Sequence, residues 1–241
     1  MRLFAGLMLF ALTACEVVPS GPRALPDVDV ASSEFPKASR PVAPIVADRW
    51  STEEARDRVS EADSVMDIAG ITQGMTVADI GAGEGYYTIR LAARVGANGR
   101  VVGQDIFPAV RDKLAARVNR ERLDNVSVKL GLATDPKLPA NSFDRIFLVH
   151  MYHEVSEPFE FLWRLRPSLR VGGRVIVVDA NRMPDEHGTP PSLLDCEMKA
   201  VGYHRVDFQE MPKAGGFFAA YEASGKRPEP AAIKPCSLPE V

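Results

Sequence analysis

Three groups of side chains in this sequence have the types and spacing to bind a small molecule or to move a proton. The first is a glycine-rich turn that follows Asp79, and the second is Asp105, which closes the next apolar run. The third is the pair His150 and His153, which follows a later apolar run. A carboxylate accepts hydrogen bonds from hydroxyl groups, and histidine can act as a general base near neutral pH. These residues predict a ligand site with a base beside it.

The glycine-rich turn reads D-I-G-A-G-E-G from Asp79 to Gly85. Glycine permits positive φ angles and close approach of a ligand, and a helix start beside it offers unpaired N–H groups. A dinucleotide-binding turn needs the spacing G-x-G-x-x-G, but here the third glycine comes one residue early and Tyr86 fills its place. Asp79 would repel a phosphate, so the turn fits a ligand that carries an ammonium group. The expected contacts are Asp79, Gly81, Ala82, Gly83 and Gly85.

The turn resembles motif I of the class I S-adenosylmethionine-dependent methyltransferases. Residues 165–179, L-R-P-S-L-R-V-G-G-R-V-I-V-V-D, resemble the helix, glycine turn and fifth strand of the same family. The resemblance covers about residues 50–223 and implies S-adenosylmethionine as the cofactor. It also implies that the helix predicted over residues 50–69 lies over the cofactor cleft, where Asp48, Arg49 or Arg56 reaches the methionine carboxylate.

Two acids are candidates for the nucleoside part of the ligand. Asp105 lies about 20 residues beyond the last glycine, which is where α/β nucleotide sites place an acid on the ribose hydroxyls; capping of the strand end is the alternative role. In the family that the turn resembles, an acid after the third strand often meets the adenine amino group, and the nearest acid here is Asp135. The expected cofactor contacts beyond the turn are Asp105, Ile106, Asp135 and His150.

Apolar runs and helical periodicity predict how these residues come together. The expected strands are 76–80, 100–105, 125–130, 145–150, 175–179, 205–211 and 216–222. The last two have no helix between them, so they should pair antiparallel. We expect an α/β fold with a doubly wound, seven-stranded, mostly parallel sheet and a C-terminal antiparallel hairpin, a Rossmann-like methyltransferase fold. Because parallel strands end at one edge of a sheet, His150 should face the same side as Gly81 and Asp105.

The N-terminus has the features of an export signal. One positive charge precedes an apolar run at residues 3–14 that is too short to span a bilayer, and L-T-A-C ends it at Cys15. Residues 1–15 resemble a bacterial lipoprotein signal peptide, which implies lipid on Cys15 and a periplasm-facing position on the cell envelope. A plain signal peptide or a stray apolar start is the alternative. Residues 16–47 are expected to be a disordered tether, 48–224 the methyltransferase domain, and 225–241 a disordered, proline-rich tail.

Charge and cysteine content narrow the partners. Proteins that bind nucleic acid usually present a basic face to it, so the formal net charge of −3 argues against a nucleic-acid partner. The charge instead favours a small-molecule substrate. Beyond Cys15 the chain has Cys196 and Cys236, which either pair in an oxidising compartment or leave the tail cysteine free. No metal is expected, since the spacing H-x-x-H-E from His150 to Glu154 matches neither H-E-x-x-H nor H-x-x-E-H.

The sequence therefore predicts an S-adenosylmethionine-dependent methyltransferase of a small molecule, anchored to a membrane by lipid. His150 and then His153 are the candidate bases, with structural packing as the alternative for each, and His187 is a third candidate. An exported position conflicts with a cofactor that is made in the cytoplasm. Two alternatives stay open: a non-catalytic exported module that binds a ligand on this fold, and an NAD(P)-dependent oxidoreductase.

Overall fold

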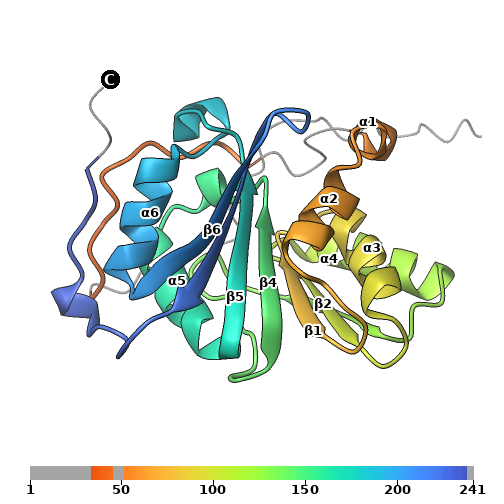
Figure 1. The fold of residues 1–241 in the computed structure, drawn as a ribbon. Coiled ribbons are helices and arrows are strands. Elements are labelled where there is room, and N and C mark those ends of the chain that lie inside the picture. The colour runs from red at the N-terminus through yellow and green to blue at the C-terminus, as the bar shows by residue number, and fades with distance from the viewer. Residues whose placement is uncertain (1–33, 46–51, 238–241) are drawn as a thin grey trace, which may run out of the picture.

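One seven-stranded sheet organises the described chain. The computed structural model describes residues 34–45 and 52–237 (Figure 1). Strand order across the sheet is β3-β2-β1-β4-β5-β7-β6. The strands are β1 (Thr76–Ile80), β2 (Arg100–Asp105), β3 (Val126–Leu130), β4 (Phe143–Val149), β5 (Leu169–Asp179), β6 (Tyr203–Met211) and β7 (Gly216–Ala223). The helices are α1 (Glu53–Arg58), α2 (Glu61–Ile68), α3 (Tyr86–Val95), α4 (Pro108–Arg120), α5 (Pro158–Leu165) and α6 (Pro191–Ala200).

The pairing directions confirm the predicted fold. Strand β1 pairs in parallel with both β2 and β4, and β4 pairs in parallel with β5. Strand β7 is antiparallel to both β5 and β6, which forms the expected C-terminal hairpin. The order of the parallel strands reverses between β1 and β4, and open α/β sheets bind ligands beyond the carboxyl ends of their strands at such a point.

The central strands are apolar because helices cover both faces of the sheet. In β5, Val175 and Val177 pack with residues of α5 and α6, whereas Ile176 and Val178 pack with residues of α2 and α3. Side chains alternate between the two faces of a strand, so a strand buried on both sides reads as a continuous apolar run. This explains why the run 175–178 could be recognised in the sequence.

The helix predicted over residues 50–69 is two helices. Thr52 caps α1 by accepting a hydrogen bond from Ala55 N at 3.2 Å. Ser60, with φ +51°, separates α1 from α2 in the left-handed region of backbone space. This break lets α1 lean over the edge of the sheet while α2 packs on its face.

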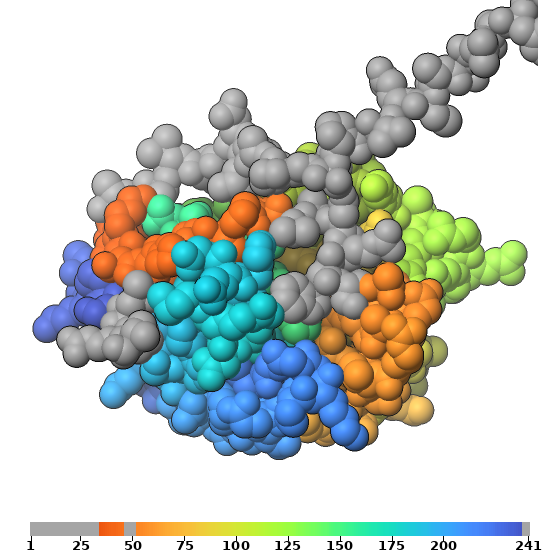
Figure 2. Space-filling view, turned by 90° about the horizontal axis from the view of Figure 1, so that it is seen from above, coloured from red at the N-terminus to blue at the C-terminus, as the bar shows by residue number. Residues whose placement is uncertain are grey.

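The tether and the tail are more ordered than predicted. Phe35 is buried with its ring centroid 5.4 Å from that of Trp163. Cys196 of α6 forms a disulfide with Cys236, which is buried. The prediction of disorder is therefore wrong for residues 34–45 and 225–237, and the paired alternative for the cysteines holds. Both segments run along α6 in Figure 1, and Figure 2 shows residues 34–45 lying across the surface seen from above.

A buried charge network fastens residues 34–45 to the body of the protein. Arg40 Nε donates to Glu197 Oε1 of α6 at 2.8 Å, and Arg40 Nη2 donates to Val155 O at 3.0 Å. Tyr152 Oη donates to Glu197 Oε2 at 2.7 Å. Both charged side chains are 1% exposed. Removing either Arg40 or Glu197 would strongly destabilise the protein, because the remaining charge would be buried without its partner.

The predicted signal peptide and Cys15 lie outside the described residues. Within the described part of the chain, no helix has both the length and the apolar character to cross a membrane.

We expect Arg40→Ala to lower the free energy of unfolding by about 3 kcal/mol, because it leaves the Glu197 carboxylate buried without its cation. Lys37→Ala is the control: Lys37 pairs with Glu157 but its side chain is 67% exposed, and such a pair contributes about 1 kcal/mol or less. Urea unfolding of the two variants measures the difference. Equal losses would show that residues 34–45 do not depend on the Arg40 network.

Candidate functional site

A cavity lies at the carboxyl ends of β1, β2 and β4, where the strand order reverses. Its wall combines backbone of the glycine-rich turn with apolar side chains from several other segments. The residues of these strand ends, of the loops after them and of the loop after β3 are Ile80, Gly81, Ala82, Gly83, Glu84, Gln104, Asp105, Ile106, Phe107, Leu132, Ala133, Val149, His150, Met151, Glu154, Val155 and Ser156. Ile45, Glu53, Arg56, Tyr86, Val110 and Phe161 complete the lining.

The glycine-rich turn presents bare backbone to the cavity. Gly83 has φ +55°, and a Cβ placed there would meet no atom within 4 Å. Ala82 N donates to Gln104 O at 2.9 Å, which holds the turn against the end of β2. Gly81 and Ala82 line the cavity as predicted, whereas Gly85 is the residue before α3 and lies outside the lining. A side chain at position 83 would need a strained backbone and would occupy space beside the ligand.

Asp105 lies beside the turn at the end of β2. Its Oδ2 accepts a hydrogen bond from Gly83 N at 3.2 Å, and its Oδ1 accepts one from Phe107 N at 3.0 Å. The residue is 7% exposed and lines the cavity together with Ile106. These two N–H groups fix the carboxylate in one orientation, and a carboxylate can accept about four hydrogen bonds in all. The geometry brings Asp105 and Gly83 together as the sequence predicted.

Asp79 lies behind the turn and does not line the cavity. It is 3% exposed, and Thr88 Oγ1 donates to its Oδ2 at 2.6 Å. Burial raises the pKa of Asp79 to about 6, against the lowering effect of the hydrogen bond from Thr88. The structure thus gives Asp79 a place in supporting the turn and does not support direct contact with a ligand.

Gln104 is a cavity residue that the sequence reasoning missed. Its side chain is 1% exposed, and neither Nε2 nor Oε1 has a hydrogen-bond partner among the described residues. Buried polar groups are nearly always paired, so this amide is an exception in the packing beside Gly131. Asp135, which was expected near the adenine, does not line the cavity; its Oδ1 accepts a hydrogen bond from Lys137 N. Nothing in the sequence singled out Gln104, because it lies within the predicted strand 100–105 and belongs to no binding motif.

His150 joins the cavity to the first helices of the domain. It lines the cavity, and its Nε2 lies 3.3 Å from Glu61 Oε1 of α2. Glu61 also accepts hydrogen bonds from Arg56 Nη2 at 2.6 Å and from Tyr87 Oη at 3.1 Å. Burial works to raise the pKa of Glu61, but the hydrogen bonds from His150 and Arg56 outweigh it and hold the pKa at about 2.

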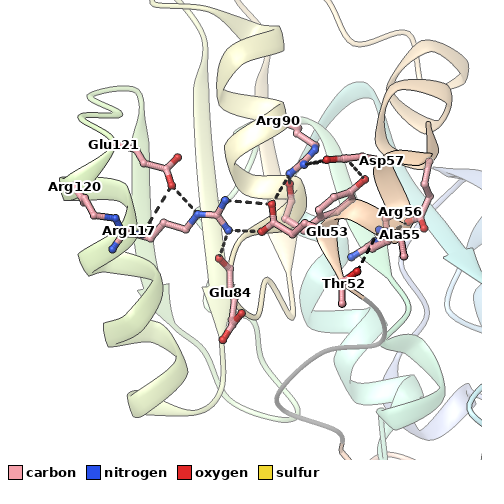
Figure 3. A network of polar contacts seen from close by, with 12 residues as sticks. Thr52, Glu53, Ala55, Arg56, Asp57, Glu84, Arg90, Arg117, Arg120 and Glu121 are labelled. Atoms are coloured by element: carbon pink, nitrogen blue, oxygen red, sulfur yellow. Dashed lines mark hydrogen bonds and ion pairs between the residues drawn. The ribbon is translucent and has the colours of Figure 1, made fainter. Parts of the chain in front are cut away.

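Ion pairs hold α1 at the rim of the cavity, as Figure 3 shows. Arg117 of α4 donates to Glu53 Oε1 at 2.5 Å and to Glu84 O at 2.9 Å. Arg90 of α3 donates to Asp57 Oδ2 at 2.7 Å. Arg56 of α1 lines the cavity, as expected for one of the three residues proposed to meet a carboxylate. Asp48 and Arg49 lie outside the described residues.

The charges of the lining favour a cationic ligand over a phosphate. Among the described lining residues, the carboxylates are Glu53, Glu84, Asp105 and Glu154. Arg56 is the one arginine in the described lining, and it is paired with Glu61. A pyrophosphate would be repelled by this excess of negative charge.

His153 does not line the cavity. It is 1% exposed, and its Nδ1 lies 2.9 Å from Asp179 Oδ1. Its neighbours are Glu154, which lines the cavity, and His187 from the loop after β5. Burial and the nearby charge of His153 lower the pKa of His187. The structure therefore separates the two histidines that the sequence grouped: His150 is on the cavity wall, and His153 lies behind it with the third candidate.

Comparison with known proteins shows similarity to methyltransferases. Residues 77–173 match the family model described as a methyltransferase domain. The chain is 30% identical over 165 residues to a ubiquinone/menaquinone biosynthesis C-methyltransferase of Hydrogenovibrio crunogenus, a match that covers 66% of this chain and 59% of that protein. It is 39% identical over 80 residues to a nocamycin O-methyltransferase of Saccharothrix syringae, covering 33% of this chain and 29% of the relative. The chain thus spans less than two thirds of the length of these curated relatives.

A solved structure agrees with the fold. A SAM dependent methyltransferase from Aquifex aeolicus superposes with a TM-score of 0.64 at 26% identity, and the match covers 69% of this chain and 91% of that chain. The arrangement of the sheet and its hairpin is thus the Rossmann-like methyltransferase fold, as the sequence predicted, and the cofactor of this fold family is S-adenosylmethionine.

The depressed pKa of Glu61 predicts a pH dependence of stability. Because its pKa falls from the ordinary 4.5 to about 2 on folding, its contribution is present above about pH 5 and is lost as the pH falls towards 2. We expect wild type to be more stable than Glu61→Gln by about 3 kcal/mol at pH 7, with the difference shrinking across that window. Urea unfolding at several pH values measures it. Glu54→Gln, at an exposed position of α1, is the control, and a constant difference for Glu61→Gln would contradict the assignment.

Proposed function

We propose that the protein transfers the methyl group of S-adenosylmethionine to a small molecule. Its residues 77–173 match the family model of a methyltransferase domain. The observation that carries the proposal is the junction of Gly83 and Asp105 at the reversal of strand order. There a bare turn adjoins a fixed carboxylate inside a largely apolar cavity whose charged lining residues are mainly acidic.

The residues present fit this cofactor. Asp105 is placed to accept hydrogen bonds from two adjacent sugar hydroxyls. Arg56, which is paired with Glu61, is the arginine of the described lining that would meet a carboxylate. When bound, the cofactor supplies an activated methyl group on a cationic sulfur.

His150 is the residue that we assign to proton removal from the acceptor. A hydroxyl, or a carbon activated by one, becomes a competent nucleophile when a base takes its proton. His150 lies on the cavity wall, and the Glu61 carboxylate, 3.3 Å from its Nε2, orients the imidazole ring. The apolar side chains of Met151, Val155 and Phe161 on the same wall favour an acceptor with an apolar body.

One of the two alternative functions differs from this one in the ligand that it binds, and the other differs in that it transfers no methyl group. A dinucleotide-dependent oxidoreductase would place pyrophosphate in the cavity, where the lining is negatively charged. A non-catalytic module would bind the cofactor or a related ligand and transfer nothing. Methyl transfer to any acceptor therefore separates the proposal from the module, and binding of NAD separates it from the oxidoreductase.

We also propose that the protein is held by lipid on Cys15, facing the periplasm. The residues that suggest this lie outside the described part of the chain. The Cys196–Cys236 disulfide supports the proposal, because disulfides persist in oxidising compartments and are rare in the bacterial cytoplasm. Such a position requires that the methyl donor reach the periplasm or that the protein act before export.

The binding proposal predicts that Asp105→Ala weakens S-adenosylmethionine about tenfold to a hundredfold, because sugar hydroxyls lose their acceptor. Gly83→Val should abolish binding, since the side chain strains the turn and enters the cavity. Calorimetric titration of the full chain in detergent with S-adenosylmethionine, S-adenosylhomocysteine and NAD measures this. Asp124→Ala, at an exposed position before β3, is the control. Unchanged affinity in both site variants would place the ligand elsewhere.

The lipid proposal predicts that Cys15→Ser moves the protein from the membrane fraction to the soluble fraction, because the acyl chains that anchor it cannot be attached. Fractionation of cells with immunoblotting, together with the mass of the mature N-terminus, measures the change. Wild-type protein without lipid on Cys15 would refute the proposal and would leave the cofactor site untouched.

A further inference from the structure

We propose that His153, Glu154 and His187 form a binding site for a divalent transition metal, with zinc as the expected ion, behind the part of the cavity wall that carries Glu154. One ligand atom from each of the three residues lies within 4.8 Å of the other two. Two imidazoles and a carboxylate are a ligand set of catalytic zinc sites, in which a fourth position stays open. The rings of His153 and His187 are perpendicular, with centroids 5.5 Å apart.

His153 is oriented for metal binding by the buried carboxylate of Asp179. Nδ1 of His153 lies 2.9 Å and 3.1 Å from the two oxygens of Asp179. With Nδ1 donating to Asp179, the lone pair of the neutral ring is on Nε2. Metal-bound histidines usually donate their second ring nitrogen to a carboxylate or carbonyl in this way, which fixes the tautomer and raises the basicity of the ligand.

Asp179 itself requires a cation nearby. It is 0% exposed, and its other donors among the described residues are Ala180 N at 2.9 Å and Thr189 Oγ1 at 2.8 Å, which are neutral. Its one ion-pair partner in the described chain is His153. A fully buried carboxylate is costly unless it is paired with a positive charge. A metal ion held by His153 supplies that charge across the imidazole.

The loop after β5 is built to bring His187 to this place. Thr189 N donates to Ala180 O at 2.8 Å, while its hydroxyl binds Asp179, so the loop returns tightly to the end of β5. Gly188 is required there, because a Cβ would lie 2.5 Å from Ala180 O. His187 thus lies two residues from Thr189, where the loop is pinned. The same carboxylate that orients His153 also holds the segment that carries His187.

The ligand atoms select the metal. Imidazole nitrogens suit zinc and its neighbours in the first transition series, whereas magnesium and calcium take oxygen ligands. Zinc bonds of about 2.0–2.2 Å suit three ligand atoms that lie within 4.8 Å of one another. Glu154 also lines the cavity, so an ion held here lies next to the cavity wall. Resting on the proposed function, the ion would fix the position of Glu154 beside the space of the acceptor.

The test is a titration of the chelator-stripped full chain in detergent with zinc chloride, without any methyl donor. We expect one zinc per chain by calorimetry and by elemental analysis. His187→Ala should weaken binding at least about a hundredfold, and Asp179→Asn about tenfold to a hundredfold through the misoriented imidazole. His204→Ala is the matched control, since His204 is an exposed histidine on β6. Far-UV circular dichroism of each variant confirms that it is folded.

Cobalt substitution gives a second readout that does not depend on the variants. Cobalt bound by two imidazoles and a carboxylate should show visible absorption bands that zinc displaces. Absence of stoichiometric zinc and of these bands in wild type, or equal weakening by His187→Ala and His204→Ala, would overturn the proposal. Binding of S-adenosylmethionine to the chelated protein is measured separately, so the metal site and the methyltransferase site can fail independently.

Discussion

Parallel pairing of β1 with β2 and β4 is the constraint on which the rest of the site depends. It brings Gly83, Asp105 and His150 to one edge of the sheet although they are far apart in sequence. No one of these residues defines a site by itself. The reversal of strand order leaves room at that edge, because the loops from β1 and β4 leave towards opposite faces of the sheet.

The fold was predictable because the strands and helices carry strong periodic signals. The runs 76–80 and 175–178 are apolar on both faces, and the absence of a helix between the last two strands fixes their antiparallel pairing. The glycine-rich turn and Asp105 were predictable for a similar reason, since both follow directly from strand ends. Contacts within one short segment leave a pattern in the sequence, and these residues all belong to such segments.

The unpredicted features depend on contacts between distant segments. Residues 34–45 are rich in proline and lack a period, so Arg40 gave no sign that Glu197, 157 residues away, would hold it. Glu61 reads as one charge among many on a helix until His150 and Arg56 converge on it. The spacing rules for metal sites test neighbours in sequence, so they give no sign that His187 lies beside His153 and Glu154 in the structure.

Helix α6 receives both ends of the described chain, through the Arg40–Glu197 pair and the Cys196–Cys236 bond. During synthesis, residues 34–45 therefore emerge early but have no surface to dock on until α6 has been made. Joining segments so far apart in sequence has an entropy cost that only the assembled body of the protein can offset. The first and last described segments are thus both tied to one helix, and Ile45 reaches the cavity wall only when residues 34–45 are docked there.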